Sequence, residues 1–424
     1  MPQGEVSTDA ASVRVQVWRT LRLTCFLVCT SIAAASAASL GLASAARTIL
    51  GAGQGLYVED ADGRVLVAQA ADTPVHPASV SKIPTTLALL SKLGPEYRFT
   101  TTFIATGPVV ADRLEGDLRV ESNGDPALVD EDALLIAARL RELGIRRVDG
   151  DLKAPGRWMF DWQSDPDGKR LRAALAGHVA PAAWASVRAL PASTSGSAST
   201  DGDQLPAVSF GADPVPNRGA SAAERPLLVH RSEPLLSMVK ALNDYSNNIF
   251  NTLAASVGGA AEVEHIAREA LPANLRGALV LQDAAGADAR NRMSPHAAVA
   301  LLRALERELA RSGHRLTDIL PVSGVDPGTL HDRLNSPEDA GSIVGKTGTY
   351  GDYGASALIG ALQSADRGTV YFAILNHGVS VPEARRRQDR FVELLRRRLR
   401  ARPWNYQRDS RPAIARIELA TPSS

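Results

Sequence analysis

Apolar and polar positions recur along this chain with two different periods, which predict helices and strands. In six segments the apolar residues return every three or four positions, as in helices with one buried face. These segments cover 79–93, 131–143, 233–257, 262–270, 294–312 and 382–401. Shorter β-rich runs predict strands at 343–347, 354–361 and 368–376. Two more runs, 56–58 and 65–67, flank a turn that contains glycine and predict a hairpin.

This order of strands and helices predicts an α+β fold, in which helices flank an antiparallel sheet. The middle of the chain has a different character, with short β-like pieces around one helix and then a stretch over 191–225 rich in Ser, Ala, Gly, Asp and Pro. We therefore expect one domain over 47–101 and 226–402. A second domain with a flexible end is inserted at 102–225, and 403–424 form a C-terminal tail.

The first 46 residues are typical of a secretory signal peptide. Three arginines precede an apolar run over 23–28, which passes into Ser- and Ala-rich sequence. Candidate cleavage points follow Ala37, Ala45 and Ala46. The alternative is an uncleaved anchor, although the apolar run is short for a transmembrane helix. We expect an exported protein of the periplasm or cell envelope, for which membrane association is possible but not required.

Composition and charge exclude several classes of protein. The chain is 45% hydrophobic and 22% charged over 424 residues, which is ordinary for a globular protein with two domains. Its net charge of +1 gives no electrostatic reason to expect nucleic acid as a partner. Both cysteines, Cys25 and Cys29, lie in the N-terminal segment, so no disulfide framework is expected. The eight histidines are scattered singly, so we expect no metal and no cofactor.

A serine and a lysine three positions apart, Ser79 and Lys82, begin the first predicted helix. Side chains at this spacing lie on the same helix face. A lysine can activate a serine nucleophile when burial and nearby positive charge lower the pKa of the lysine. Pro84, six residues into the helix, is expected to bend its first turns. The tetrapeptide alone does not decide the site, because Ser237 and Lys240 have the same spacing.

A second motif, Ser246-Asn247-Asn248, follows a helical run. Ser246 can relay a proton between Lys82 and a leaving amine, and Asn248 can hold a substrate amide. The alternative is a helix cap, for which Ser and Asn are also favoured.

A third motif, Lys346-Thr347-Gly348-Thr349, lies on a strand-like run. The charge of Lys346 can lower the pKa of Lys82 and attract a substrate carboxylate, to which Thr347 offers a hydroxyl. Gly348 has no side chain, so a peptide can lie directly against the strand edge. The alternative is an ordinary strand that ends at a turn. The order and spacing of the three motifs together favour an active site over three unrelated local structures.

The set Ser-x-x-Lys, Ser-x-Asn and Lys-Thr-Gly resembles the penicillin-recognising serine enzymes. The chain is most similar to the D-alanyl-D-alanine carboxypeptidases/endopeptidases among the class C low-molecular-weight penicillin-binding proteins, peptidase family S13. Other similar stretches are Gly124-Asp125-Pro126-Ala127-Leu128, Leu320-Pro321-Val322-Ser323-Gly324 and Gly328-Thr329-Leu330. The resemblance covers most of residues 54–378 and is thin between about 155 and 225.

This resemblance implies a β-lactamase/transpeptidase-like fold, with the catalytic domain over 47–101 and 226–402. It also implies hydrolysis of peptidoglycan stem peptides through an acyl-serine intermediate, and acylation by β-lactam antibiotics. The implied roles are acylation of Ser79, base catalysis by Lys82, a cleft lined by Ser246 and Asn248, carboxylate binding by Lys346 and Thr347, and an oxyanion hole formed by the backbone N–H groups of Ser79 and Thr349.

The chain departs from the family pattern at three places. The inserted domain is shorter than in members with two inserted domains, Asn247 replaces a frequent aspartate, and Asp283-Ala284-Ala285-Gly286 replaces Asp-Gly-Ser-Gly. The changed loop motivates one alternative, a weakly active peptidoglycan-binding protein, and a β-lactamase or esterase on the same fold is another. A Ser-His-Asp triad is not favoured, since the chain has no Gly-x-Ser-x-Gly elbow.

Overall fold

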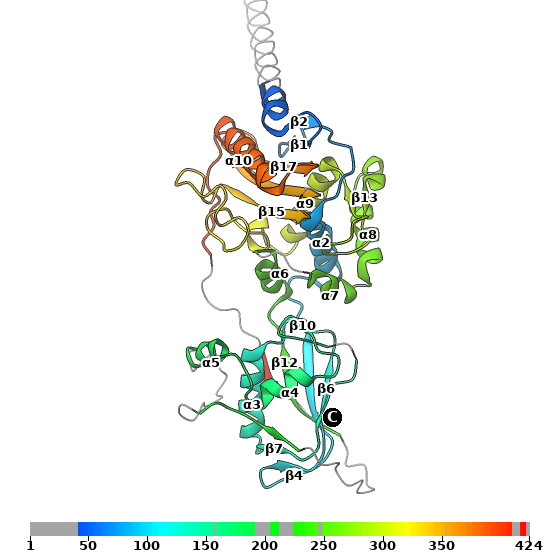
Figure 1. Cartoon of the computed structure of the whole chain (residues 1–424), viewed down its shortest axis with the longest axis vertical. Helices are drawn as coiled ribbons and strands as arrows, with labels where there is room; N and C mark the ends of the chain where they lie inside the picture. The colour runs from blue at the N-terminus through cyan, green and yellow to red at the C-terminus, as the bar shows by residue number, and fades with distance from the viewer. Residues whose placement is uncertain are drawn as a thin grey trace, which may run out of the picture.

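A computed structural model describes residues 41–156, 158–190, 204–211, 224–244, 248–352, 354–408 and 416–420. Figure 1 shows two bodies: an upper one that contains most of the predicted catalytic domain, and a lower one built from the middle of the chain together with one C-terminal strand.

The upper body is organised by a five-stranded sheet in which every neighbouring pair is antiparallel. In spatial order its strands are β15 (Ile343–Tyr350), β16 (Ala355–Ser364), β17 (Gly368–His377), β1 (Gly55–Glu59) and β2 (Val65–Gln69). The predicted hairpin and the three predicted strands near the C-terminus are therefore confirmed. Because β1 pairs with β17, for example Leu56 with Ile374, the two parts of the chain that flank the insertion form one sheet.

Helices cover both faces of this sheet (Figure 1). One core contains Ile359 and Ala361 of β16 together with the helices α2 (Lys82–Leu93), α6 (Leu235–Asp244), α7 (Phe250–Ala255), α8 (Gly259–Ala270) and α9 (Pro295–Ala310). The alternate residues Leu358 and Leu362 lie in a second core, under α10 (Val381–Arg398). The strand period of two thus separates the two cores.

The single helix predicted over 233–257 is wrong. The described residues form α6 and then α7, and the backbone at 248–249 is a bend and a turn. Short elements complete the upper body: the 3-10 helices η1 (Ala78–Ser81), η2 (Ala273–Ala278) and η3 (Leu316–Asp318), and the paired strands β13 (Leu279–Val280) and β14 (Arg292–Met293).

The lower body has its own sheet and its own apolar core. In spatial order the strands are β18 (Arg416–Leu419), β12 (Arg225–Arg231), β3 (Thr100–Ala105), β6 (Leu118–Ser122) and β8 (Leu152–Lys153). Helix α3 (Asp130–Glu142) packs on this sheet, and β18 belongs to the segment that we expected only to be a tail.

Smaller elements surround this sheet: β4 (Val109–Val110), β5 (Arg113–Leu114), β7 (Arg147–Val148), β9 (Met159–Phe160), β10 (Gln163–Ser164), α4 (Lys169–Leu175), α5 (Pro181–Arg188) and β11 (Ser209–Phe210).

Residues 41–50 are helical and pack onto the upper body. Leu42, Ala46 and Leu50 are buried in the core that includes Phe391 and Leu395 of α10. Among the residues that the structure describes, no helix is long and apolar enough to cross a membrane.

Candidate active site

Ser79 and Lys82 meet at the start of α2. Lys82 Nζ donates hydrogen bonds to Ser79 Oγ, at 2.9 Å, and to the carbonyl oxygen of Ala285, at 2.6 Å. Ser79 lies in the 3-10 turn η1, and α2 begins only at Lys82, so the predicted helix start was three residues too early. Pro84 is therefore the third helical residue, where its missing N–H would have no helical partner. Pro84 therefore removes no hydrogen bond from the helix, and the reason given for a bend in its first turns does not apply.

Burial controls the charge of the two lysines. Both Lys82 and Lys346 are fully buried. Desolvation lowers the pKa of Lys82 to about 8, against the opposing charge of Asp283. The pKa of Lys346 is also lowered, first by burial and then by the charge of Lys82, while Asp244 opposes the shift. A neutral lysine beside Ser79 is therefore accessible near physiological pH, as a general base requires.

Strand β15 lies directly against the nucleophile turn. A Cβ at Gly348 would lie 2.9 Å from the carbonyl oxygen of Pro77 and 2.9 Å from Ser79 N. Real Cβ atoms essentially never approach this closely, so glycine is needed here to let the strand and the turn touch. Since β15 is also the edge strand of its sheet, one side of it borders on the site rather than on another strand.

Two polar side chains that the sequence analysis missed contact this strand. Thr329 Oγ1 shares a hydrogen bond of 2.6 Å with Thr347 Oγ1. Arg385 Nη2 donates to Thr349 Oγ1 at 3.0 Å. Thr329 lies in a stretch that resembles the family, but it is 18 residues from Thr347 in sequence, so the sequence did not indicate the contact. Arg385 belongs to the arginine-rich helix α10, which the sequence analysis did not connect with the site.

The second motif is described only in part. Ser246 and Asn247 lie outside the described residues, and Asn248 is exposed. Two residues further on, the ring centroid of Phe250 lies 5.4 Å from Lys82 Nζ, so the chain after the motif reaches the site. On the other side of the motif, burial raises the pKa of Asp244 to about 7, and this carboxylate acts on the charge of Lys346.

The loop 283–286 reaches the site through its backbone. The carbonyl oxygens of Ala284 and Ala285 accept hydrogen bonds from Thr85 Oγ1, at 2.7 Å, and from Lys82 Nζ. The carboxylate of Asp283 accepts the N–H groups of residues 286, 287 and 288 and thereby closes the loop. The replacement of a family serine by Ala285 leaves this contact to Lys82 intact, since a carbonyl oxygen makes it.

The second Ser-x-x-Lys sequence has a structural role. Lys240 Nζ donates to the carbonyl oxygens of Thr317 and Leu320 and to the carboxylate of Asp326, at 2.5 Å for the last. These contacts bind α6 to the segment around η3. Lys240 is therefore committed to an internal ion pair, whereas Lys82 is hydrogen-bonded to a serine.

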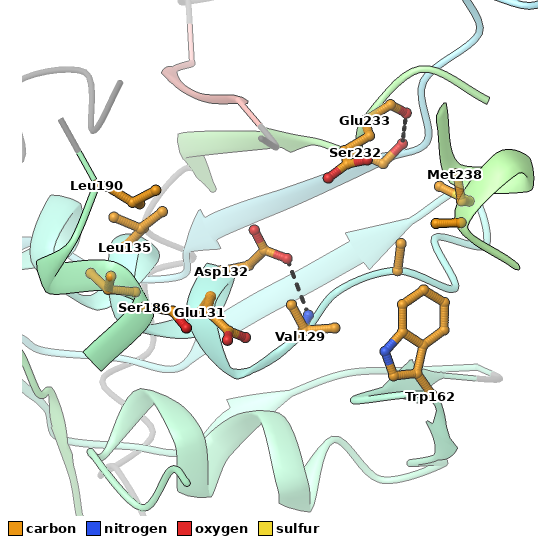
Figure 2. Close-up of a pocket in the computed structure, with 13 residues that line it drawn as sticks. Val129, Glu131, Asp132, Leu135, Trp162, Ser186, Leu190, Ser232, Glu233 and Met238 are labelled. Carbon is orange, nitrogen blue, oxygen red and sulfur yellow. Dashed lines mark hydrogen bonds between the residues drawn. The ribbon is translucent and has the colours of Figure 1, made fainter. Parts of the chain in front are cut away.

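A cavity of about 350 Å³ lies between α3 and α6, away from Ser79 and the two lysines (Figure 2). Its walls include the apolar side chains of Leu135, Trp162 and Met238, and the carboxylates of Glu131 and Glu233. No predicted site residue lines it. Among the described residues, no group of three or more His, Cys, Asp or Glu side chains is placed to hold a metal ion.

Comparison with known families assigns the chain. The model of the D-Ala-D-Ala carboxypeptidase 3 (S13) family matches residues 38–190 and 211–398, which is most of the sequence. The chain belongs to this family.

Two proteins with sequences similar to parts of this S13 chain are D-alanyl-D-alanine carboxypeptidases. DacB of Haemophilus influenzae is 32% identical over 75 residues, which cover 18% of this chain and 16% of that relative. The enzyme of Actinomadura sp. (strain R39) is 36% identical over 112 residues, which cover 26% of this chain and 21% of the relative. These matches span only about a fifth or less of the relatives' length.

A solved structure matches over nearly its full length. It is a predatory endopeptidase from Bdellovibrio bacteriovorus, acylated by penicillin G and bound to an immunity protein. The TM-score is 0.69 at 19% identity, and the match covers 84% of this S13 chain and 95% of the other. The similarity shows a shared fold, and it confirms the predicted transpeptidase-like antiparallel sheet flanked by helices.

Proposed function

We propose that this S13 protein is a serine-type D-Ala-D-Ala carboxypeptidase/endopeptidase that hydrolyses peptidoglycan stem peptides through an acyl-Ser79 intermediate. One observation carries the proposal: Lys82, fully buried and with its pKa lowered to about 8, lies 2.9 Å from Ser79 Oγ. Neutral lysine accepts the serine proton as Oγ attacks the carbonyl carbon of the scissile bond. The family of the chain and the enzymes named above support this choice of substrate.

The remaining steps follow from the surroundings of Ser79. The C–N bond breaks, the leaving amine takes a proton through Ser246, and water then hydrolyses the ester. Lys346 and Thr347 bind the carboxylate next to the scissile bond, and the N–H groups of Ser79 and Thr349 stabilise the oxyanion. The contact between Gly348 and Ser79 N supports this placement, because it brings strand and turn together. β-Lactams would acylate Ser79 by the same attack.

We further propose that the protein is exported and cleaved after Ala37. Cleavage after Ala45 or Ala46 would remove Leu42, whose side chain is buried in the core under α10. The family match begins at residue 38, which fits the earlier cut. N-terminal sequencing of the protein secreted to the cell envelope tests this: a mature chain that begins at residue 46 or 47 would contradict it.

The activity is tested by labelling with a fluorescent penicillin. Wild type and the matched control Ser237→Ala should be labelled, and Ser79→Ala should not. An unlabelled wild type would overturn the acyl-enzyme proposal. Release of D-alanine from a muramyl pentapeptide then separates the alternatives: label without release favours a binding protein, and rapid loss of label with antibiotic hydrolysis favours a β-lactamase.

A further inference from the structure

His76 lies three residues before Ser79, and both of its ring nitrogens are engaged. The backbone N–H of Ala78 donates to Nδ1 at 3.1 Å, and Nε2 lies 3.0 Å from the carbonyl oxygen of Asp288. Because Nδ1 accepts a hydrogen bond, it carries no proton. The proton is therefore on Nε2 and is donated to Asp288, so this geometry fits only the neutral ring.

These contacts connect the three segments that build the site. Ala78 precedes the nucleophile, and Asp288 ends the loop whose Ala285 carbonyl binds Lys82. The ring of Tyr350 packs against the ring of His76 at an interplanar angle of 31°, with centroids 4.0 Å apart. Tyr350 directly follows the Lys346–Thr349 motif on β15. His76 is thus in contact with the nucleophile turn, the lysine-binding loop and the end of the edge strand.

The segment that His76 holds is strained. Ala78 has a φ of +49°, a left-handed conformation that costs an alanine on the order of 1 kcal/mol or more. Such a conformation persists only where neighbouring contacts enforce it. The bond from Ala78 N to His76 is one such contact, and it fixes the peptide that leads into Ser79.

We propose that His76 is a positioning residue for acylation: its neutral imidazole holds the Ala78 peptide and the 283–288 loop so that Ser79 Oγ and Lys82 Nζ face each other. This inference rests on the proposed function, because acylation is the reaction measured.

Protonation of His76 would break this arrangement, since an N–H at Nδ1 would face the N–H of Ala78. The pKa of His76 is lowered, mainly by burial, with Arg292 acting in the same direction; the hydrogen bond to Asp288 and the carboxylates of Asp283 and Asp288 act in the opposite direction. The titratable ring of Tyr350 also packs against His76, from the end of β15. The ring is therefore neutral at physiological pH and becomes charged only in acid.

The test is the rate of labelling by fluorescent penicillin between pH 5 and 9. In the wild type, one proton on Lys82 slows acylation below pH 8, and the proton on His76 adds a second, steeper dependence in acid. His76→Ala should acylate about 10²-fold more slowly at pH 7.5, because small misplacements of reacting groups have effects of this size. His76→Asn should recover much of the rate, since an Asn side chain can accept the N–H two residues on. It should also lose the steeper acid dependence.

The matched control is His265→Ala, an exposed histidine of α8, which should keep the wild-type profile. Circular dichroism and Tm identify variants that fail to fold. If His76→Ala fails to fold, His76→Asn decides the test. Wild-type rates in folded His76→Ala, or an unchanged acid dependence in His76→Asn, would overturn the inference and leave the proposed function standing. An unlabelled wild type would overturn both.

Discussion

Gly286 packs against the carbonyl group of Ala78 so closely that a Cβ at position 286 would lie 1.9 Å from that oxygen. Its φ of +87° is also one that other residues rarely adopt. The contact joins the lysine-binding loop to the nucleophile turn through backbone alone. Two segments about 200 residues apart in sequence are therefore in direct backbone contact at the site.

Gly286→Ala should damage acylation more than it damages folding. The added methyl group must push the loop away from Ala78, and the Ala285 carbonyl then leaves Lys82. We expect acylation to fall by about 10²-fold and stability by about 1–3 kcal/mol. Gly313→Ala is the control: its φ is +77°, but nothing lies within 4 Å of the new Cβ, so only stability should fall. Equal acylation rates in the two variants would contradict the assigned contact.

Lys346→Ala should weaken acylation with little loss of stability. The side chain is fully buried, so its charge is costly in the folded protein, and its removal relieves this cost while it opens a cavity. We expect acylation by carboxylate-bearing substrates to fall about 10²–10³-fold, the usual effect of removing one preorganised electrostatic contact. Stopped-flow acylation and thermal unfolding measure the two effects; parallel losses would show a structural role instead.

Lys82 makes stability depend on pH with a definite sign. Its folded pKa of about 8 lies below the ordinary 10.5, so between these values the folded protein binds fewer protons than the unfolded chain. Stability from this group therefore rises with pH over that window, by up to about 3 kcal/mol. The difference in unfolding free energy between wild type and Lys82→Met, measured from pH 7 to 10, should change by this amount. A constant difference would refute the shift.

His230 in the lower body should have the opposite dependence. It is fully buried between two carboxylates. Nδ1 lies 3.2 Å from Asp125 Oδ2, and Nε2 lies 3.4 Å from Asp132 Oδ1. Burial alone would lower its pKa, but the two carboxylates raise the pKa to about 10. Its stabilisation is therefore complete below pH 6.5 and is lost as pH rises toward 10. His230→Gln should lower Tm at pH 6 and much less at pH 10, with penicillin labelling at neutral pH unchanged in folded protein.

Lys240→Met should separate the two Ser-x-x-Lys sequences. Removal of the lysine leaves Asp326 buried without its cation, which typically costs about 3–5 kcal/mol. The folded fraction should still acylate normally, since Lys240 binds only the segment around η3 in the contacts described above. Ser237→Ala should change neither property. A labelling defect in folded Lys240→Met would return this pair to the list of site candidates.

Local patterns predicted the parts of the site that neighbouring residues determine. The spacing of Ser79 and Lys82 and the strand around Lys346 follow from helix and strand periods. The roles of Thr329, Arg385 and the Ala285 carbonyl could not be predicted in this way, because each depends on contact between segments distant in sequence. Backbone carbonyls carry no residue signature at all. The four-residue strand β18 is likewise too short for a period to appear, and only its pairing with β12 reveals it.

The pairing of β18 with β12 gives the lower body a third covalent connection to the upper one. The chain passes between the bodies near residues 99–100 and 231–232, and again between residues 408 and 416. The eight Cα–Cα steps from residue 408 to residue 416 reach at most about 28 Å, so this last segment limits how far the bodies can separate. A hinge motion at the first two crossings would have to extend this segment or separate β18 from β12. Truncation after residue 408 would therefore release interdomain motion without touching any catalytic group.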